Sequence, residues 1–207
     1  MDIALQLKQF TIEAHTIELF VPDPLAVRTA YENGTIPFPY WSQVWPAAIG
    51  LTQFLLKNPE VVQDKIILEL GAGLGLPSLA ITPYAKKVIC TDLSAEAIKV
   101  MENSVRYNKL NNFYLAQLDW KELANNFEAD VVLLSDVNYT PSVFPVQQKL
   151  IERILKEKKT IFLSTPQRLM AGDFVTSIIK HCIRQEEIKV QYRESIVPIT
   201  VMVLSSI

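Results

Sequence analysis

The chain has 207 residues, 49% of them hydrophobic, and a net charge of −2. This length fits one domain, or one domain with an extension, and supplies enough apolar side chains for a sizeable core. Nucleic-acid binding normally shows as clustered Lys and Arg, and the charge balance argues against it. The one basic cluster, residues 156–159, is interrupted by Glu157 and is typical of a helix end.

Targeting and metal signals are missing from the sequence. The first residues contain no basic segment followed by an apolar run, and no stretch of about 18 apolar residues occurs, so we expect neither a signal peptide nor a membrane span. Cys90 and Cys182 do not form a disulfide framework, which makes the cytoplasm the expected compartment. His15 and His181 share no ligand spacing, so we expect no metal site.

The N-terminal part predicts a small extension and an aromatic segment. Weak alternation over residues 1–23 predicts a hairpin, and Asp23-Pro24 predicts a helix that Gly34 ends. A second helix is expected from Ala47 to about Lys57, after the segment PFPYWSQVWP. The two tryptophans of this segment, Trp41 and Trp45, either fill the edge of the core or line a ligand cleft, since an indole offers a flat face to a base or a cation.

Residues 66–75, IILELGAGLG, predict a buried strand, a tight turn and a helix that starts near Leu74. Gly71, Gly73 and Gly75 alternate, which differs from the Gly-x-Gly-x-x-Gly of dinucleotide sites, and the lysine of a phosphate-binding loop is missing. Glu69 would repel a pyrophosphate but could meet an ammonium group. The turn therefore favours a ligand that carries both an amine and a nucleoside.

Two more strand ends carry acids. A strand over residues 88–91 ends at Asp92, which lies 21 residues after Gly71 and can accept hydrogen bonds from ribose hydroxyls. Ser94 is expected to cap the next helix, over residues 95–108. A third strand over residues 113–118 is followed by Asp119 and Trp120, which suit the exocyclic amine and the ring of an adenine.

The C-terminal half continues the alternation of strand and helix. We expect strands over residues 130–134 and 160–164 and helices over 143–156 and roughly 172–184. Residues 188–192 alternate like an edge strand, and the apolar run 196–204 suits a central strand whose pairing starts after Pro198. The order predicts an α/β protein with a Rossmann-like, doubly wound, seven-stranded sheet, mostly parallel with the last strand antiparallel. Residues 1–36 would form a hairpin and helix extension packed on a single domain, residues 37–207.

The glycine turn and its surroundings resemble the class I, seven-strand S-adenosylmethionine-dependent methyltransferases from about Phe38 to Ile207. Three further patterns are similar to the Asp-x-x-Tyr group of lysine protein methyltransferases and nicotinamide N-methylase-like proteins. These patterns are residues 39–46 (PYWSQVWP), 118–120 (LDW) and 136–139 (DVNY). The chain departs from that group at Asn138 and in its short length, which leaves little room for a separate substrate-recognition domain.

The resemblance implies roles for individual residues. The cofactor would be S-adenosylmethionine, converted to S-adenosylhomocysteine, with no metal. Glu69, Gly71 and Gly73 would hold its methionine end and Asp92 its ribose; the adenine would lie against Leu93, Asp119 and Trp120, flanked by Trp45 and Ser135. Asp136 and Tyr139 would face the acceptor amine, with Asp136 orienting the ammonium by a charge-assisted hydrogen bond.

Several functions remain open at the level of the sequence. The first is a protein lysine N-methyltransferase, and the second a small-molecule N-methyltransferase, because the same site serves both. A cofactor-binding protein without catalysis is a third possibility, against which the set of Asp92, Asp119 and Asp136 argues. Nucleic-acid methylation is a weak fourth, since no Asn/Asp-Pro-Pro-aromatic run follows the fourth strand. No membrane partner is expected, and the sequence does not indicate the oligomeric state.

Overall fold

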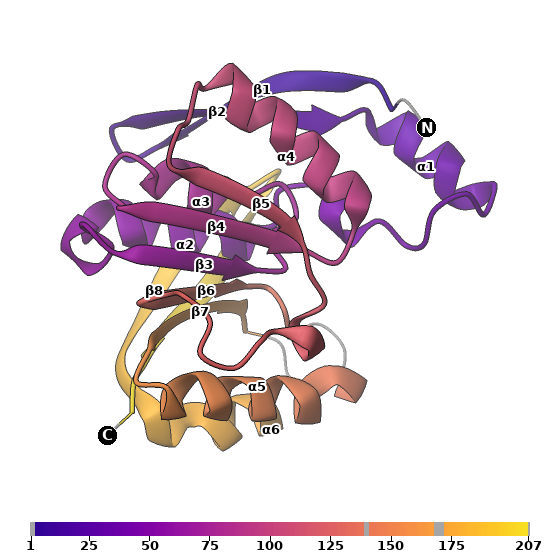
Figure 1. The fold of residues 1–207 in the computed structure, drawn as a ribbon. Helices are drawn as coiled ribbons and strands as arrows, with labels where there is room; N and C mark the ends of the chain where they lie inside the picture. Colours follow the sequence, from indigo (N-terminus) through magenta and orange to yellow (C-terminus); the bar gives the residue numbers. More distant parts are fainter. Residues whose placement is uncertain (1–2, 139–140, 168–171, 207) are drawn as a thin grey trace.

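A seven-stranded sheet forms the centre of the computed structural model, which describes residues 3–138, 141–167 and 172–206 (Figure 1). The strands are β3 (Ile66–Leu70), β4 (Lys87–Asp92), β5 (Phe113–Gln117), β6 (Val131–Ser135), β7 (Thr160–Pro166), β8 (Cys182–Tyr192) and β9 (Ser195–Leu204). Their order across the sheet is β5-β4-β3-β6-β7-β9-β8. The first five strands are parallel, and β9 is inserted between β7 and β8, antiparallel to both. This confirms the predicted fold class.

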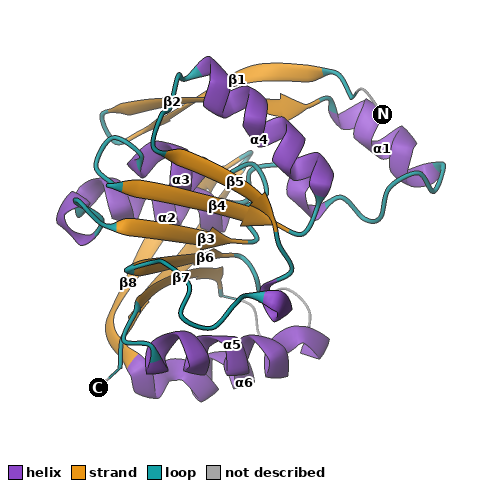
Figure 2. Cartoon of the chain, in the orientation of Figure 1, coloured by secondary structure: helices purple, strands orange, loops and turns teal. Residues whose placement is uncertain are grey.

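Helices cover both faces of the sheet (Figure 2). The α-helices of the domain are α2 (Pro46–Lys57), α3 (Leu76–Ile81), α4 (Ala95–Tyr107), α5 (Phe144–Lys156) and α6 (Gly172–Ile178). Single 3₁₀ turns are η1 (Tyr40–Ser42), η2 (Pro59–Val61), η3 (Trp120–Glu122), η4 (Pro141–Val143) and η6 (Ile179–His181). None of the described helices is long and apolar enough to cross a bilayer.

The two faces of the sheet form two apolar clusters, because successive side chains of a strand point to opposite sides. Ile67 and Leu133 pack in one cluster with residues of α2, α3 and α4. Leu68 and Leu134 pack in the other with residues of α5 and α6. Since β3 and β6 are buried on both faces, their sequences read as continuous apolar runs, and this is why they could be predicted.

The N-terminal extension consists of the predicted hairpin, β1 (Leu5–Ile12) and β2 (His15–Pro22), and of α1 (Pro24–Glu32). The Asp23 carboxylate caps α1 by accepting from the backbone N–H of Ala26 at 2.9 Å. The hairpin lies over α4 (Figure 1), where the backbone N–H of Phe20 donates to the Ser104 hydroxyl at 2.9 Å. Leu19 is fully buried there, in the same apolar cluster as α2, α3 and α4.

Two predictions about the C-terminal part are wrong. The helix expected over residues 172–184 ends at Ile178, and the chain passes through η6 into β8 at Cys182. Pairing of the last strand also starts before Pro198, which lies opposite Lys189 of β8. The neighbour on the other side, β7, pairs only from Ile199 onward. Pro198 therefore has a strand partner on one side only, a position where its missing N–H is tolerated.

Candidate active site

A cavity of about 690 Å³ opens at the carboxyl ends of the parallel strands. Five segments and Val143 contribute the residues that line it. The segments are residues 37–48, 71–76, 92–96, 117–121 and 135–137. In a doubly wound sheet this edge, at the point between β3 and β6 where the strand order reverses, is the usual place for a ligand. The size of the cavity is that of a pocket for a nucleoside-sized molecule.

The glycine turn between β3 and α3 forms the floor of this cavity. Gly71 and Gly73 have φ angles of 66° and 58°, the left-handed region in which a side chain is strained. A Cβ on Gly71 would lie 3.3 Å from Cζ3 of Trp120, and one on Gly73 would lie 3.5 Å from the carbonyl oxygen of Trp41. Both neighbours line the cavity, so glycine lets the backbone of the turn approach them and a ligand closely.

Asp92 connects the end of β4 to the glycine turn. One carboxylate oxygen accepts from the backbone N–H of Gly73 and the other from that of Ser94, each at 2.8 Å. Burial raises the pKa of Asp92, and the backbone N–H groups partly oppose this. Each oxygen keeps a second acceptor site, so the carboxylate can fix the turn and still accept from a ligand hydroxyl. The predicted contact with a ribose is compatible with this position and stays a prediction.

Glu69 is the one expected cofactor residue of the described part that does not line the cavity. Its side chain is fully buried, and Oε2 accepts from the hydroxyl and the backbone N–H of Ser78, at 2.5 and 3.2 Å. Oε1 has no hydrogen-bond partner among the described residues. Burial raises the pKa of Glu69 to about 7. The structure thus places this carboxyl in the core, where it ties β3 to α3.

The segment after β5 brings Asp119 and Trp120 to the cavity, as expected. Asp119 starts η3, and its carboxylate accepts from the backbone N–H of Lys121 at 2.9 Å. The Trp120 ring is half-buried against the glycine turn. Leu93, which follows the neighbouring strand β4, also lines the cavity and is 64% exposed.

Both tryptophans of the aromatic segment line the cavity, and Trp41 also belongs to the core. Trp41 therefore fits both interpretations that the sequence left open, because it fills the edge of the core and also lines the cavity. Trp45 precedes α2, and its indole N–H donates to the carbonyl oxygen of Tyr40 at 2.7 Å. This bond closes the segment into a compact wall of the cavity.

The segment after β6 supplies the last wall. Ser135 is half-buried and Asp136 almost fully buried, and both line the cavity. Asp136 has a φ of +53°, and its backbone N–H donates to the carbonyl oxygen of Ser164 at 3.0 Å. Aspartate is one of the non-glycine residues that adopt this conformation at single turn positions. Tyr139 lies outside the described residues.

Other residues of the site carried no readable signal in the sequence. Glu96 and Lys121 line the cavity but belong to no sequence motif, and within the aromatic segment only the tryptophans were expected at a ligand, although Phe38 and Tyr40 also line the cavity. Ser78 is nine residues from Glu69 and could have been found only by knowing which side of α3 faces β3. Within the described part of the chain, no group of three or more His, Cys, Asp or Glu side chains has the geometry of a metal site.

Comparison with known proteins identifies related sequences. A family profile described as lysine methyltransferase matches residues 40–181. A Xenopus laevis protein named histone-arginine methyltransferase METTL23 is 37% identical over 112 residues, covering 51% of this chain and 47% of the relative. The human electron transfer flavoprotein beta subunit lysine methyltransferase is 28% identical over 136 residues, covering 65% and 49%. The chain thus spans about half the length of these curated relatives.

Solved structures agree on the fold. The 16S rRNA N2 G1207 methyltransferase RsmC of T. thermophilus, solved with AdoMet and guanosine, matches 100% of this chain and 52% of its own, with a TM-score of 0.70 and 14% identity. The Pyrococcus abyssi tRNA (uracil-54, C5)-methyltransferase, solved with S-adenosyl-L-homocysteine, matches 96% and 44%, with a TM-score of 0.63 and 12% identity. At these identities the likeness concerns the fold alone.

Proposed function

Because the chain belongs to the lysine methyltransferase family, we propose that it transfers a methyl group from S-adenosylmethionine to the side-chain amine of a protein lysine. The observation that carries this proposal is the composition of the cavity. Among its lining residues, Asp92, Glu96, Asp119 and Asp136 are acidic and Lys121 alone is basic. Such a cavity favours a sulfonium cofactor and a cationic acceptor over a phosphate or a carboxylate.

The residues present fit the cofactor. Gly71 and Gly73 line the cavity and would bring the backbone of the turn close to its methionine part, and Asp92 keeps acceptor sites for the ribose. Leu93, Asp119 and Trp120 offer an apolar face and a carboxylate for the adenine, with Trp45 and Ser135 at its flanks. When bound, the cofactor would supply a methyl group activated by its sulfonium, so that an N–C bond forms to the acceptor amine as the C–S bond breaks and the sulfur leaves as a thioether. The protein then has to align the amine, exclude bulk water and let the proton of the acceptor leave to solvent.

Glu69 does not line the cavity, so its contact with the methionine end stays a prediction of the resemblance. Because it lies in the core and bonds Ser78, we propose that it acts on the methionine end through the glycine turn that it supports. Its Oε1 has no hydrogen-bond partner among the described residues.

Asp136 is the proposed orienting group for the acceptor. It follows β6, across the cavity from the residues proposed to hold the adenine, and a carboxylate there can fix a lysine ammonium by a charge-assisted hydrogen bond. Tyr139 would add to this orientation. We assign to Asp136 the orientation of the acceptor, and not proton abstraction.

An arginine acceptor is the second candidate, because the Xenopus relative is named as an arginine methyltransferase. A carboxylate can bind a guanidinium through two parallel hydrogen bonds as readily as it binds an ammonium. A small free amine is the third. All three acceptors would meet the same acid, and a chemical analysis of the product separates them.

The test uses methyl-labelled cofactor and a cell extract. We expect label in discrete protein bands and, after acid hydrolysis, in methyl-lysine; label in methyl-arginine would favour the second candidate and label in a low-mass fraction the third. Asp136→Asn keeps a residue type that tolerates the positive φ. It should lower transfer at least about 100-fold, the order expected for a misaligned acceptor, while calorimetry finds cofactor affinity nearly unchanged. A fully active Asp136→Asn protein would remove Asp136 from its role.

A further inference from the structure

Three exposed aromatic rings form a continuous row beside the cavity. Tyr31 belongs to the last turn of α1, and Phe38 and Tyr40 to the segment that leads to α2. The ring centroids of Tyr31 and Phe38 are 5.3 Å apart and those of Phe38 and Tyr40 4.4 Å apart. The three side chains are 44%, 53% and 44% exposed. We call these three residues the aromatic row.

The aromatic row is continuous with the proposed site of methyl transfer. Phe38 and Tyr40 also line the cavity, whereas Tyr31 lies outside it. The indole of Trp45 holds the carbonyl oxygen of Tyr40, which fixes the inner end of the row to the cavity wall. Large rings left in water next to a ligand cavity mark an interaction surface, because tyrosine and phenylalanine dominate the energetics of protein contacts.

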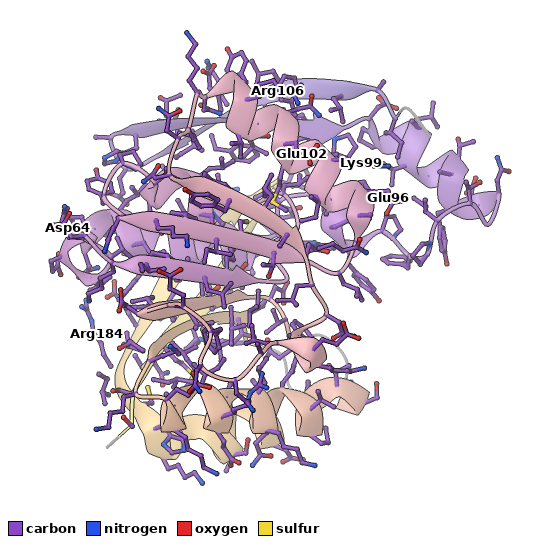
Figure 3. All side chains as sticks on the ribbon, in the orientation of Figure 1. Asp64, Glu96, Lys99, Glu102, Arg106 and Arg184 are labelled. Atoms are coloured by element: carbon purple, nitrogen blue, oxygen red, sulfur yellow. The ribbon has the colours of Figure 1, made fainter. Side chains whose placement is uncertain are left out.

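The charge around the cavity selects the kind of partner. The lining carries four acids, Asp92, Glu96, Asp119 and Asp136, against the single base Lys121. Along α4, Glu96 projects from the end that borders the cavity, whereas Arg106 lies at the opposite end (Figure 3). Asp92 and Asp119 are the proposed cofactor residues, which leaves Glu96 and Asp136 for the acceptor. These two acids beside exposed rings disfavour a nucleic-acid backbone and favour a basic protein segment.

We propose that the aromatic row is the docking surface for the protein segment that carries the acceptor lysine. The occupant is a segment with aliphatic side chains against the rings and basic side chains next to the lysine, which enters the cavity past Phe38 and Tyr40. This inference rests on the proposed function and adds to it the class of substrate. A free amine small enough to fit inside the cavity would have no contact with Tyr31.

The test replaces the outer end of the row, which takes no part in the cavity. Tyr31→Ser removes an exposed ring, and Tyr114→Ser is the matched control, since Tyr114 is 52% exposed and lies near the start of β5, away from the cavity. Each protein receives methyl-labelled cofactor and limiting amounts of nuclease-treated cell extract. Protein labelling is compared with cofactor affinity measured by calorimetry and with the elution volume in size exclusion.

We expect Tyr31→Ser to lower protein labelling at least about fivefold, as is common for an interface tyrosine, with cofactor affinity and elution unchanged and with Tyr114→Ser like the wild type. Equal labelling by wild type and Tyr31→Ser overturns the docking surface while leaving the proposed function intact. A change in elution would assign the row to contact between copies of the chain. If the wild type labels only low-mass compounds or nothing at all, the protein-lysine function fails, and the docking surface fails with it.

Discussion

Glu69 is the residue whose burial has the largest expected effect on stability. Its pKa rises from 4.5 to about 7 because the carboxyl is removed from water. Between these values the folded protein holds a proton that the unfolded chain has lost, so the free energy of unfolding falls as pH rises through this window. Over about 2.5 pH units the loss amounts to roughly 3 kcal/mol.

Glu69→Gln should therefore flatten the dependence of stability on pH. Glutamine keeps the shape and an oxygen for the Ser78 hydroxyl, but it cannot ionise. Urea unfolding at pH 5 and pH 8 should show a smaller difference for Glu69→Gln than for the wild type. Ser78→Ala is the opposite control. The hydrogen bond from Ser78 lowers the pKa of Glu69, so its loss should raise that pKa further. The decline in the free energy of unfolding should then extend to higher pH. An unchanged slope in Glu69→Gln would contradict this assignment.

The contrast between Asp92 and Glu69 shows what could be predicted at single positions. Both acids lie in the last two residues of parallel strands, and the spacing after the glycine turn predicted that Asp92 lies at the ligand cavity, where the structure places it. Glu69 occupies the penultimate position of β3, where successive side chains point to opposite faces. The packing of α3 decides which face of β3 is covered and brings the Ser78 hydroxyl to Glu69. The sequence does not display this packing.

At the scale of elements, the packing of α2 on the sheet depends on a glycine. Gly50 lies in this helix, and a Cβ there would come within 2.8 and 3.0 Å of Cγ2 and Cβ of Ile199 in β9. Ile199 is fully buried and β-branched, so it cannot move aside easily. The helix must instead shift away from β9, which lowers packing along the whole contact.

Gly50→Ala should destabilise the protein although alanine is the better helix former. The gain in helix propensity is about 1 kcal/mol, whereas overpacking costs about 1–3 kcal/mol, so thermal unfolding should show a lower Tm. Gly172→Ala makes the same change in the first residue of α6, where nothing lies within 4 Å of the new Cβ. Its Tm should stay the same or rise, and a Gly50→Ala protein as stable as Gly172→Ala would contradict the tight contact.

The elements themselves were largely predictable, and the errors have a common cause. Strands buried on both faces and the caps Asp23 and Ser94 are local signals, so these boundaries agree within a few residues. The extent of β8 and the pairing at Pro198 depend on where the neighbouring strands end. Those ends are set by tertiary contacts, which propensity and periodicity along one segment do not contain.

At the scale of the molecule, the cavity is assembled from segments that span residues 37 to 143. The topology brings them together because parallel strands place their carboxyl ends at one edge of the sheet. The sequence could predict the acids and glycines at this edge from their positions after strands. It could not predict the aromatic row, since Tyr31 and Phe38 reach the cavity mouth only through the course of the chain between α1 and α2.

Residues 1–36 contact the rest of the chain closely enough that we expect the whole molecule to unfold in one cooperative step. Leu19 of β2 is fully buried in the cluster that includes Ile67 and Val88 of the central sheet. The Asn108 side chain at the end of α4 donates to the carbonyl oxygen of Glu18 at 2.8 Å. A perturbation of the hairpin core should therefore reach the sheet and the cavity.

Leu19→Ala should lower the free energy of unfolding by about 2–5 kcal/mol, the cost of a buried cavity left by a lost leucine. We expect one transition in denaturant, with circular dichroism and cofactor binding lost together. Leu7→Ala is the control, because Leu7 lies on the exposed side of β1 and its loss leaves no cavity in the core. Two separate transitions, with the second at the wild-type midpoint, would instead make the extension an independent unit. A single transition means that the surface proposed to dock the substrate and the cavity proposed to bind the cofactor fold as one body, so that the docking surface holds a fixed distance from the site of transfer.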